Sequence, residues 1–227
     1  MAREDGERRL LYGRRRGHTL SPRQRGLFDE RLPALAIDPA AVMAAPVAAM
    51  EIGFGGGEHL LHEAARHPYW LFLGCEPFEN GVASLIAGIE ETKVRNIRLH
   101  CGDARDILAR LDAACLDRID ILYPDPWPKR RHRKRRFFGE DTLNAMARGL
   151  KPGGIIRFAS DIDHYVGWTL ARIAAHPAFV WEARDARDWL DPWEGWPGTR
   201  YEAKAIAAGR RPSYLIFRRR ADEIGEA

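Results

Sequence analysis

Short apolar runs alternate with helical patterns through most of the chain, and this alternation limits the fold more than any other feature. Five runs have the length and composition of buried strands, at residues 47–52, 69–75, 97–101, 119–123 and 155–159. The segments between them carry apolar residues three or four positions apart, as at Val82, Leu85, Ile86 and Ile89, which is the spacing of one helix face. Repeated strand–helix units predict a parallel sheet with right-handed crossovers.

The other segments between strands show the same helical spacing of apolar residues, whereas the end of the chain no longer alternates strand with helix. Apolar faces are expected at Leu60, Leu61, Ala64 and Ala65, at Ile107, Leu108 and Leu111, and at Leu143, Met146, Ala147 and Leu150. A Lys-Pro-Gly-Gly segment, 151–154, should stop the last of these helices. Two late strands, 179–183 and 214–217, have less helix between them and suggest an antiparallel finish. The sequence predicts a doubly wound, mainly parallel α/β sheet with a hairpin-like end, and such sheets bind ligands at the carboxyl ends of their strands.

Length and composition fit a single globular unit with a short arm at each end. The 227 residues are enough for one α/β domain. We expect a basic N-terminal extension at 1–40, with a helix start capped by Ser21, then the domain at 41–220 and a tail at 221–227. The sequence has no run of about 18 apolar residues and no signal-like start, so we expect no membrane association and no export. Three scattered cysteines predict neither a disulfide framework nor a zinc site, which fits the cytoplasm.

The positive charge is concentrated in one segment. Lys and Arg number 36 against 32 Asp and Glu, a net charge of +4, and seven of those cations lie in residues 129–136. Without these seven the chain would carry −3, so the rest of the molecule is mildly acidic. A second basic cluster is formed by Arg14, Arg15 and Arg16. Such local cation density is typical of a protein that binds a polyanion, although a solvated loop or a localisation signal would give the same composition.

A glycine-rich loop follows the first expected strand. It runs from Glu51 through Gly53 and Gly55 to Glu58. Glycines let the backbone turn sharply beside a ligand, but the two flanking acids would repel the pyrophosphate of a dinucleotide. S-adenosylmethionine, which carries an ammonium and a sulfonium and no phosphate, suits this loop better. A plain glycine-rich turn is the alternative.

Acids also follow the next two strands. Glu76 is placed to accept hydrogen bonds from both hydroxyls of a ribose, an arrangement that NAD-dependent and S-adenosylmethionine-dependent enzymes share. Asp103 follows Gly102 and is placed either to accept from an adenine amino group or simply to cap the next helix. The series Glu51, Glu76 and Asp103 at successive strand ends is more specific than any one of its members.

The fourth strand leads into a proline-braced turn, Tyr123-Pro-Asp-Pro-Trp-Pro-Lys129. Three prolines in five residues fix the backbone and remove amide donors, which would hold Asp125 and Trp127 still. Trp127 could stack on a nucleic-acid base or simply be buried. A carboxylate between two prolines has little structural purpose, so Asp125 is the candidate for chemistry. Because the basic segment begins here, the pocket, the carboxylate, the aromatic ring and the cations should be contiguous.

Together these segments resemble the bacterial tRNA (guanine-N7-)-methyltransferase family over nearly the whole chain. The resemblance rests on residues 51–57, 74–77, 102–104 and 123–129 with the basic continuation, and on Ser160-Asp161 and Thr199-Arg-Tyr-Glu202; Gly13–Thr19 is also similar. It implies a Rossmann-like class I methyltransferase with a seven-stranded sheet. It also implies S-adenosylmethionine as methyl donor, no metal, tRNA as partner and a monomer or homodimer.

The resemblance assigns roles by position. Asp125 would be catalytic. The donor would be bound by Glu51, Gly53, Gly55, Glu76, Asp103 and Asp125. The tRNA would be bound by Lys129, Arg130, Arg131, Arg133, Lys134, Arg135, Arg136, Asp161, Thr199, Arg200, Tyr201 and Glu202. The implied reaction is methylation of guanine N7 in the variable loop of tRNA. An amino-group methyltransferase acting on adenine or cytosine, an NAD-dependent oxidoreductase and a catalytically silent tRNA-binding subunit are the alternatives.

Overall fold

Seven strands form one sheet in the computed structural model, which describes residues 15–221. Their order is β3-β2-β1-β4-β5-β7-β6. The pairings from β3 to β5 are parallel, whereas β7 is antiparallel to β5 and to β6. The strands are β1 (Ala48–Ile52), β2 (Leu71–Cys75), β3 (Ile97–His100), β4 (Leu116–Leu122), β5 (Leu150–Ser160), β6 (Phe179–Trp181) and β7 (Ser213–Arg219). The predicted mainly parallel sheet with an antiparallel C-terminal hairpin is confirmed.

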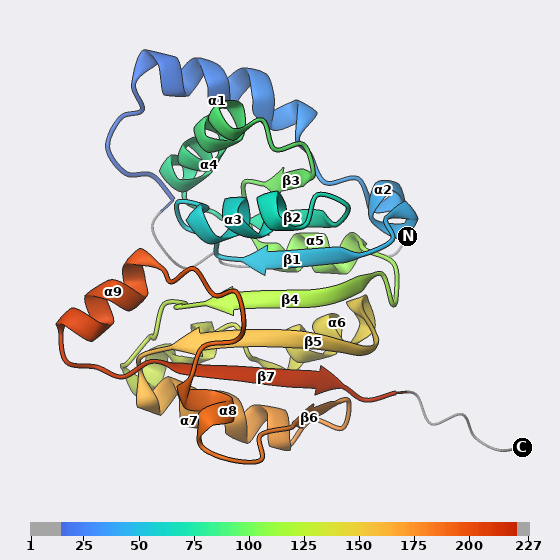
Figure 1. Cartoon of the computed structure of the whole chain (residues 1–227), viewed down its shortest axis with the longest axis vertical. Helices are drawn as coiled ribbons and strands as arrows, with labels where there is room; N and C mark the ends of the chain where they lie inside the picture. The colour runs from blue at the N-terminus through green and yellow to red at the C-terminus, as the bar shows by residue number, and fades with distance from the viewer. Residues whose placement is uncertain (1–14, 222–227) are drawn as a thin grey trace, which may run out of the picture.

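Helices cover both faces of the sheet (Figure 1). One face packs on α5 (Ala104–Arg110), α6 (Glu140–Gly149) and α7 (Asp163–Ala174). The other packs on α3 (Glu58–Arg66) and α4 (Glu79–Thr92), with α1 (Pro22–Ala34) lying over α4. The described residues also form three short helices, α2 (Pro39–Ala44), α8 (Arg187–Leu190) and α9 (Arg200–Ala207), and one 3-10 helix, η1 (Arg130–Arg135). In Figure 1 the arrows of β1, β4 and β5 point toward the side on which α9 lies.

The first described residues are packed against α4 and the core beneath it. Ser21 accepts a hydrogen bond from the Gln24 amide and the two form a capping box, which confirms the predicted helix start. Just before it, Arg16 pairs with Glu79 at 2.8 Å, and the Gly17 amide donates to the side chain of Asn80 at 2.7 Å. These contacts fasten residues 15–18 to the first turn of α4. Arg14 and residues 222–227 lie outside the described part of the chain.

Three local expectations were wrong in detail. Helix α6 ends at Gly149, and residues 151–154 belong to β5 as an irregular start, where the register against β4 shifts and Gly153 has φ +78°. Ala65 is exposed because it lies off the buried stripe of α3. Tyr69 is 86% exposed and precedes β2. Helix α7, which follows β5, was not expected.

Candidate active site

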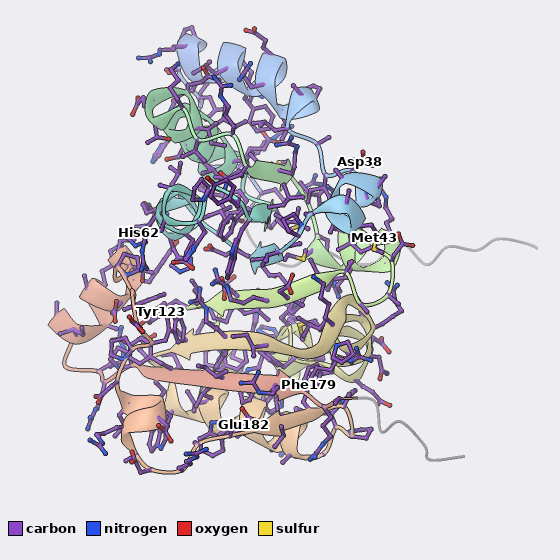
Figure 2. The ribbon with its side chains drawn as sticks, turned by 45° about the vertical axis from the view of Figure 1, so that its right-hand side comes forward. Asp38, Met43, His62, Tyr123, Phe179 and Glu182 are labelled. Atoms are coloured by element: carbon purple, nitrogen blue, oxygen red, sulfur yellow. The ribbon has the colours of Figure 1, made fainter. Side chains whose placement is uncertain are left out.

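A cleft opens at the carboxyl ends of β1, β2 and β4. Its main cavity has a volume of about 390 Å³, within the range of small-molecule sites. Tyr123 directly follows β4 and lines this cavity; Figure 2 labels it just beyond the tip of that strand. The residues that line this cavity include Gly53, Gly55, Glu76, Asp125, Trp127 and Tyr201.

A smaller lobe of about 140 Å³ continues the cleft toward β3. Ile52, Gly53 and Phe137 line both lobes, so the two are adjacent. Asp103 lines the smaller lobe. The structure therefore brings Glu76, Asp103 and Asp125, which follow three different strands, to one cleft.

The glycine loop and Glu76 hold each other in place. Gly53 and Gly55 have φ of +77° and +58°, a region that a residue with a Cβ rarely adopts. The Gly55 amide donates to one carboxylate oxygen of Glu76 at 2.8 Å, and the Phe78 amide donates to the other at 2.9 Å. Burial raises the pKa of Glu76, against the effect of these two amides. Glu76 thus fixes the shape of the loop at the floor of the cleft.

Asp103 caps the next helix, as one of the two interpretations of its sequence position predicted. It caps α5 by accepting from the Arg105 amide at 3.0 Å, and it pairs with the Arg105 guanidinium, with Nη2 at 2.5 Å. Its side chain also borders the smaller lobe of the cleft. The cap and the pairing fix the direction in which the carboxylate points.

Glu51 lies behind the cleft and does not line either lobe. Its side chain is 4% exposed, and its Oε2 is 2.7 Å from Nδ1 of His59 on α3. Ile52 and Gly53, the next two residues along the chain, line both lobes. Glu51 is therefore next to the pocket wall, on the α3 side of the sheet.

The turn after β4 is strained at two residues. Tyr123 and Trp127 have φ of 48° and 43°, which is unfavourable for side chains of this size. Asp125 stands between them, exposed, at the mouth of the cleft. The Arg135 guanidinium lies 4.8 Å from the centre of the Trp127 ring, a cation–π distance. Strain of this kind needs support from surrounding contacts, and the basic segment supplies it.

Arg136 differs from its neighbours in the basic segment. It is 4% exposed, its Nε donates to the Pro126 carbonyl at 2.9 Å, and its Nη2 lies 3.0 Å from Nδ1 of His164. The guanidinium also stacks over Tyr165 at 4.6 Å. The expectation that Arg136 meets the RNA backbone is therefore corrected: it is buried, and it ties the turn to α7.

Replacing Arg136 by Met should lower the free energy of unfolding by about 2–3 kcal/mol, because charged hydrogen bonds and a buried carbonyl partner are lost. Urea unfolding of the purified chain measures this. Arg133→Met is the matched control: Arg133 is exposed on η1, and its replacement should change stability by less than about 0.5 kcal/mol. Equal losses for the two variants would contradict the assigned role of Arg136.

The other cations lie on η1 or, for Lys129, at its N-cap. Lys129, Arg130, Arg131, Arg133 and Lys134 are exposed, and Arg135 is half-buried and lines both lobes. The segment follows the turn without a break and returns through Arg136 to the body of the protein. An exposed row of positive charge thus begins at the mouth of the pocket.

In the segment 199–202 two residues are structural and one, Tyr201, lines the site. Thr199 and Glu202 form the capping box of α9. Glu202 is buried and accepts from Trp196 Nε1 at 2.8 Å and from the Tyr214 hydroxyl. Tyr201 lines the main cavity, and Arg200 reaches Glu58 at 3.6 Å.

Asp161 directly follows β5, at the carboxyl ends of the parallel strands. It pairs with Arg210 at 2.5 Å, and its side chain is 13% exposed. This pair joins β5 to the segment between α9 and β7. Asp161 is therefore held at the strand end by a partner of its own.

A group that the sequence interpretation missed lies between α3 and the sheet. We call it the buried charge cluster: Glu51, His59, Glu63, Arg118, Asp120 and Arg157. Asp120 bonds to both arginines, at 3.0 Å to Arg118 Nε and 2.6 Å to Arg157 Nε. Glu63 bonds to the same two, at 2.5 and 3.2 Å. Burial disfavours the charged form of Asp120, but the arginines lower its pKa to about 2.

A signal for this cluster was present in the sequence. Arg118 and Asp120 interrupt the apolar run of β4, and Arg157 interrupts that of β5. Charged residues at alternate positions of a buried strand must face partners. The register sets Glu51, Asp120 and Arg157 side by side across β1, β4 and β5.

Within residues 15–221, no three His, Cys, Asp or Glu side chains are grouped as a metal ion would require. None of the helices described there is long and apolar enough to cross a membrane.

Comparisons with known proteins show the family to which the chain belongs. Residues 45–214 match a family model described as a putative methyltransferase. A tRNA (guanine-N(7)-)-methyltransferase of Azorhizobium caulinodans is 52% identical over 217 residues, which cover 92% of this chain and 94% of that protein. Proteins of the same name from Rhizobium meliloti and Brucella melitensis are 52% and 51% identical, each over 92% of this chain and 94% of the relative.

Solved structures show the same fold at low identity. A 16S rRNA (adenine(1408)-N(1))-methyltransferase from Catenulisporales acidiphilia aligns with a TM-score of 0.54 at 16% identity, over 82% of this chain and 92% of that one. An rRNA methylase from Streptococcus thermophilus gives 0.53 at 9%, over 80% and 91%. The fold is thus that of the methyltransferases, and the identity to curated relatives is high over nearly the full length. The chain belongs to the tRNA (guanine-N(7)-)-methyltransferase family.

Proposed function

We propose that this chain transfers a methyl group from S-adenosylmethionine to N7 of a guanine in the variable loop of tRNA. One observation carries the proposal: the turn with Asp125 lines the same cleft as Glu76 and continues directly into the cationic segment at 129–135. A donor pocket, a carboxylate and a polyanion-binding surface are therefore contiguous. The curated relatives carry this activity in their names.

The chemistry of the cleft fits the proposed donor. Its wall offers the carboxylates of Glu76, Asp125 and Asp103, which suit hydroxyls, amino groups and positive charge better than phosphate. Glu76 would hold the ribose, Asp103 the adenine end, and Gly53 and Gly55 would let the backbone approach the ligand. Glu51 would add negative charge from behind the wall. S-adenosylmethionine, when bound, supplies an electrophilic methyl group.

The acceptor atom sets what the protein must do. Guanine N7 has an in-plane lone pair and no proton, so a strong general base is unnecessary and positioning is the main requirement. The purine gains positive charge as the methyl group arrives. Asp125, held by its two prolines at the mouth of the cleft, would stabilise that charge or hold the base edge by hydrogen bonds. Trp127 and Tyr201 both line the pocket and would offer aromatic rings for a base to stack on.

The exposed cations would hold the tRNA. Lys129, Arg130, Arg131, Arg133, Lys134 and Arg135 would contact phosphates, which fixes the position of the RNA and carries no sequence information. Arg200 and Tyr201 would contact the substrate directly. Thr199, Glu202 and Asp161 would act mainly by holding α9 and the end of β5 in place.

We further propose residues 41–220 as the catalytic domain, a cytoplasmic location, and a monomer or homodimer as the working form.

A transfer assay tests the activity. The purified chain is incubated with labelled S-adenosylmethionine and two tRNA transcripts that differ only in whether the variable loop contains its guanine. We expect label to enter the first transcript and not the second. Equal labelling of both would show that another site is methylated, and labelling of neither would contradict the proposed function.

A further inference from the structure

The buried carboxylate of Glu202 joins α9 to two other parts of the molecule. One of its oxygens accepts a hydrogen bond from the Tyr214 hydroxyl on β7. The other accepts from Trp196 Nε1 at 2.8 Å and from the Thr199 amide at 3.1 Å. Glu202 is 7% exposed, and a buried carboxylate is stable only when donors satisfy its oxygens. The first turn of α9 is therefore fastened to β7 and to the preceding loop through this side chain.

Tyr214 is held in place by aromatic rings and by the sheet. The rings of Trp193 and Trp196 lie nearly edge-on to it, with ring centres 5.7 and 5.9 Å away, which is a preferred arrangement of aromatic pairs. On β7, Tyr214 pairs with Ala159 of β5. Burial and the bonded carboxylate raise the pKa of Tyr214, so the hydroxyl keeps the proton that it donates.

Two segments that line the cleft, the turn after β4 and α9, are both in contact with Tyr214. Tyr123, the first residue of the strained turn, packs with Tyr214 in one apolar cluster, and Asp125 follows two residues later. Tyr201 directly precedes the buried carboxylate of α9 and lines the main cavity. It lies beside the glycine loop, because a Cβ on Gly55 would be 3.5 Å from the Tyr201 hydroxyl. Both segments thus take their positions partly from the same phenol side chain.

We propose that Tyr214 is a positioning residue for methyl transfer: its hydroxyl sets α9 through Glu202 and so fixes where Tyr201 stands in the cleft. The inference rests on the proposed function, in which Tyr201 contacts the tRNA substrate. Methyl transfer needs the acceptor atom in line with the donor, and a small displacement of a group that positions them slows the reaction. Tyr214 lines neither lobe of the cleft, so it acts through its neighbours.

The variant Tyr214→Phe tests this on the full chain, because it removes the hydroxyl and keeps the packing of the ring. We expect single-turnover methyl transfer at saturating donor and tRNA to slow by about tenfold. Donor affinity should change little, because Glu76 and Asp103 are untouched, and tRNA affinity should change little, because the phosphate contacts are kept. Trp196→Phe removes the donor to the other oxygen of Glu202 and should slow transfer in the same way.

A double-mutant cycle separates positioning from general destabilisation. If Tyr214 acts through Tyr201, Tyr214→Phe should slow the wild type by about tenfold and the Tyr201→Ala variant by less than about twofold. The melting temperature should fall by a similar amount in both backgrounds. Asn96→Ala is the control for stability: Asn96 donates three hydrogen bonds of 3.0–3.1 Å to backbone carbonyls beside the amino end of β3, away from the cleft. It should lower the melting temperature at least as much and leave the rate unchanged.

Three results would overturn the inference. They are an unchanged rate for Tyr214→Phe, an equal slowing by Tyr214→Phe in the wild-type and Tyr201→Ala backgrounds, and a slowing by Asn96→Ala as large as that by Tyr214→Phe. Each leaves the proposed function intact, because the wild type still methylates the transcript that carries the variable-loop guanine. Failure of the wild type to methylate that transcript would contradict both.

Discussion

Replacing Asp125 by Asn should lower the rate of methyl transfer at saturating donor and tRNA by about 10²–10³-fold. The substitution keeps the size of the side chain and one hydrogen-bond acceptor, and removes the negative charge. If the carboxylate stabilises the positive charge that develops on the purine, the loss falls on the chemical step. Donor and tRNA affinities should then change much less than the rate.

Asp112→Asn is the matched control for that experiment. Asp112 is exposed and precedes β4, so it lies at the amino ends of the parallel strands, away from the cleft. Its replacement should leave the rate unchanged. Single-turnover rates, with melting temperatures to show that both variants are folded, separate the two cases. A near-normal rate for Asp125→Asn would remove the proposed role of the carboxylate.

Neutralising the exposed part of the basic segment should weaken tRNA binding by about 10²-fold or more at low salt. The variant carries Gln at Arg130, Arg131, Arg133 and Lys134. If each cation neutralises one phosphate, the slope of log affinity against log salt should fall by about 3 to 4. The rate at saturating tRNA should change little, because Asp125 and the cleft are untouched. Filter binding at several salt concentrations measures both quantities.

A control with the same change in net charge exists on this chain. Four exposed cations lie at the amino ends of the parallel strands, away from the cleft: Lys93, Arg95, Arg110 and Arg220. Replacing these four by Gln should leave the affinity and the salt slope close to those of the wild type. An equal loss in the two variants would show that net charge governs binding, rather than the segment beside the cleft.

The sequence predicted the part of the site that depends on strand ends. Glu76, Asp103 and Asp125 follow strands whose apolar runs are clear, and parallel strands bring their carboxyl ends together. Glu51 belongs to the same series, but its side chain faces α3 because the side chains of a strand alternate between faces. Every residue of β1 is buried, so the local pattern does not show which of the two faces Glu51 takes.

The missing features involve contacts between distant residues. Arg136 could not be distinguished from its six cationic neighbours, because its burial depends on Pro126 and on His164 of a helix that was not expected. The buried charge cluster joins four elements, and its members pair at separations of up to about a hundred residues, as in Arg157 and His59. The irregular start of β5 depends on its pairing with β4. Local patterns do not contain these partners.

Mapping the methylated atom tests the central claim most directly. tRNA incubated with the chain and S-adenosylmethionine is reduced and treated with aniline, which cleaves the strand at N7-methylguanine. We predict donor-dependent cleavage at a guanine of the variable loop, strongly reduced when Asp125→Asn replaces the wild type. Incorporated methyl groups without cleavage, located instead on an amino nitrogen of adenine or cytosine, would contradict the account.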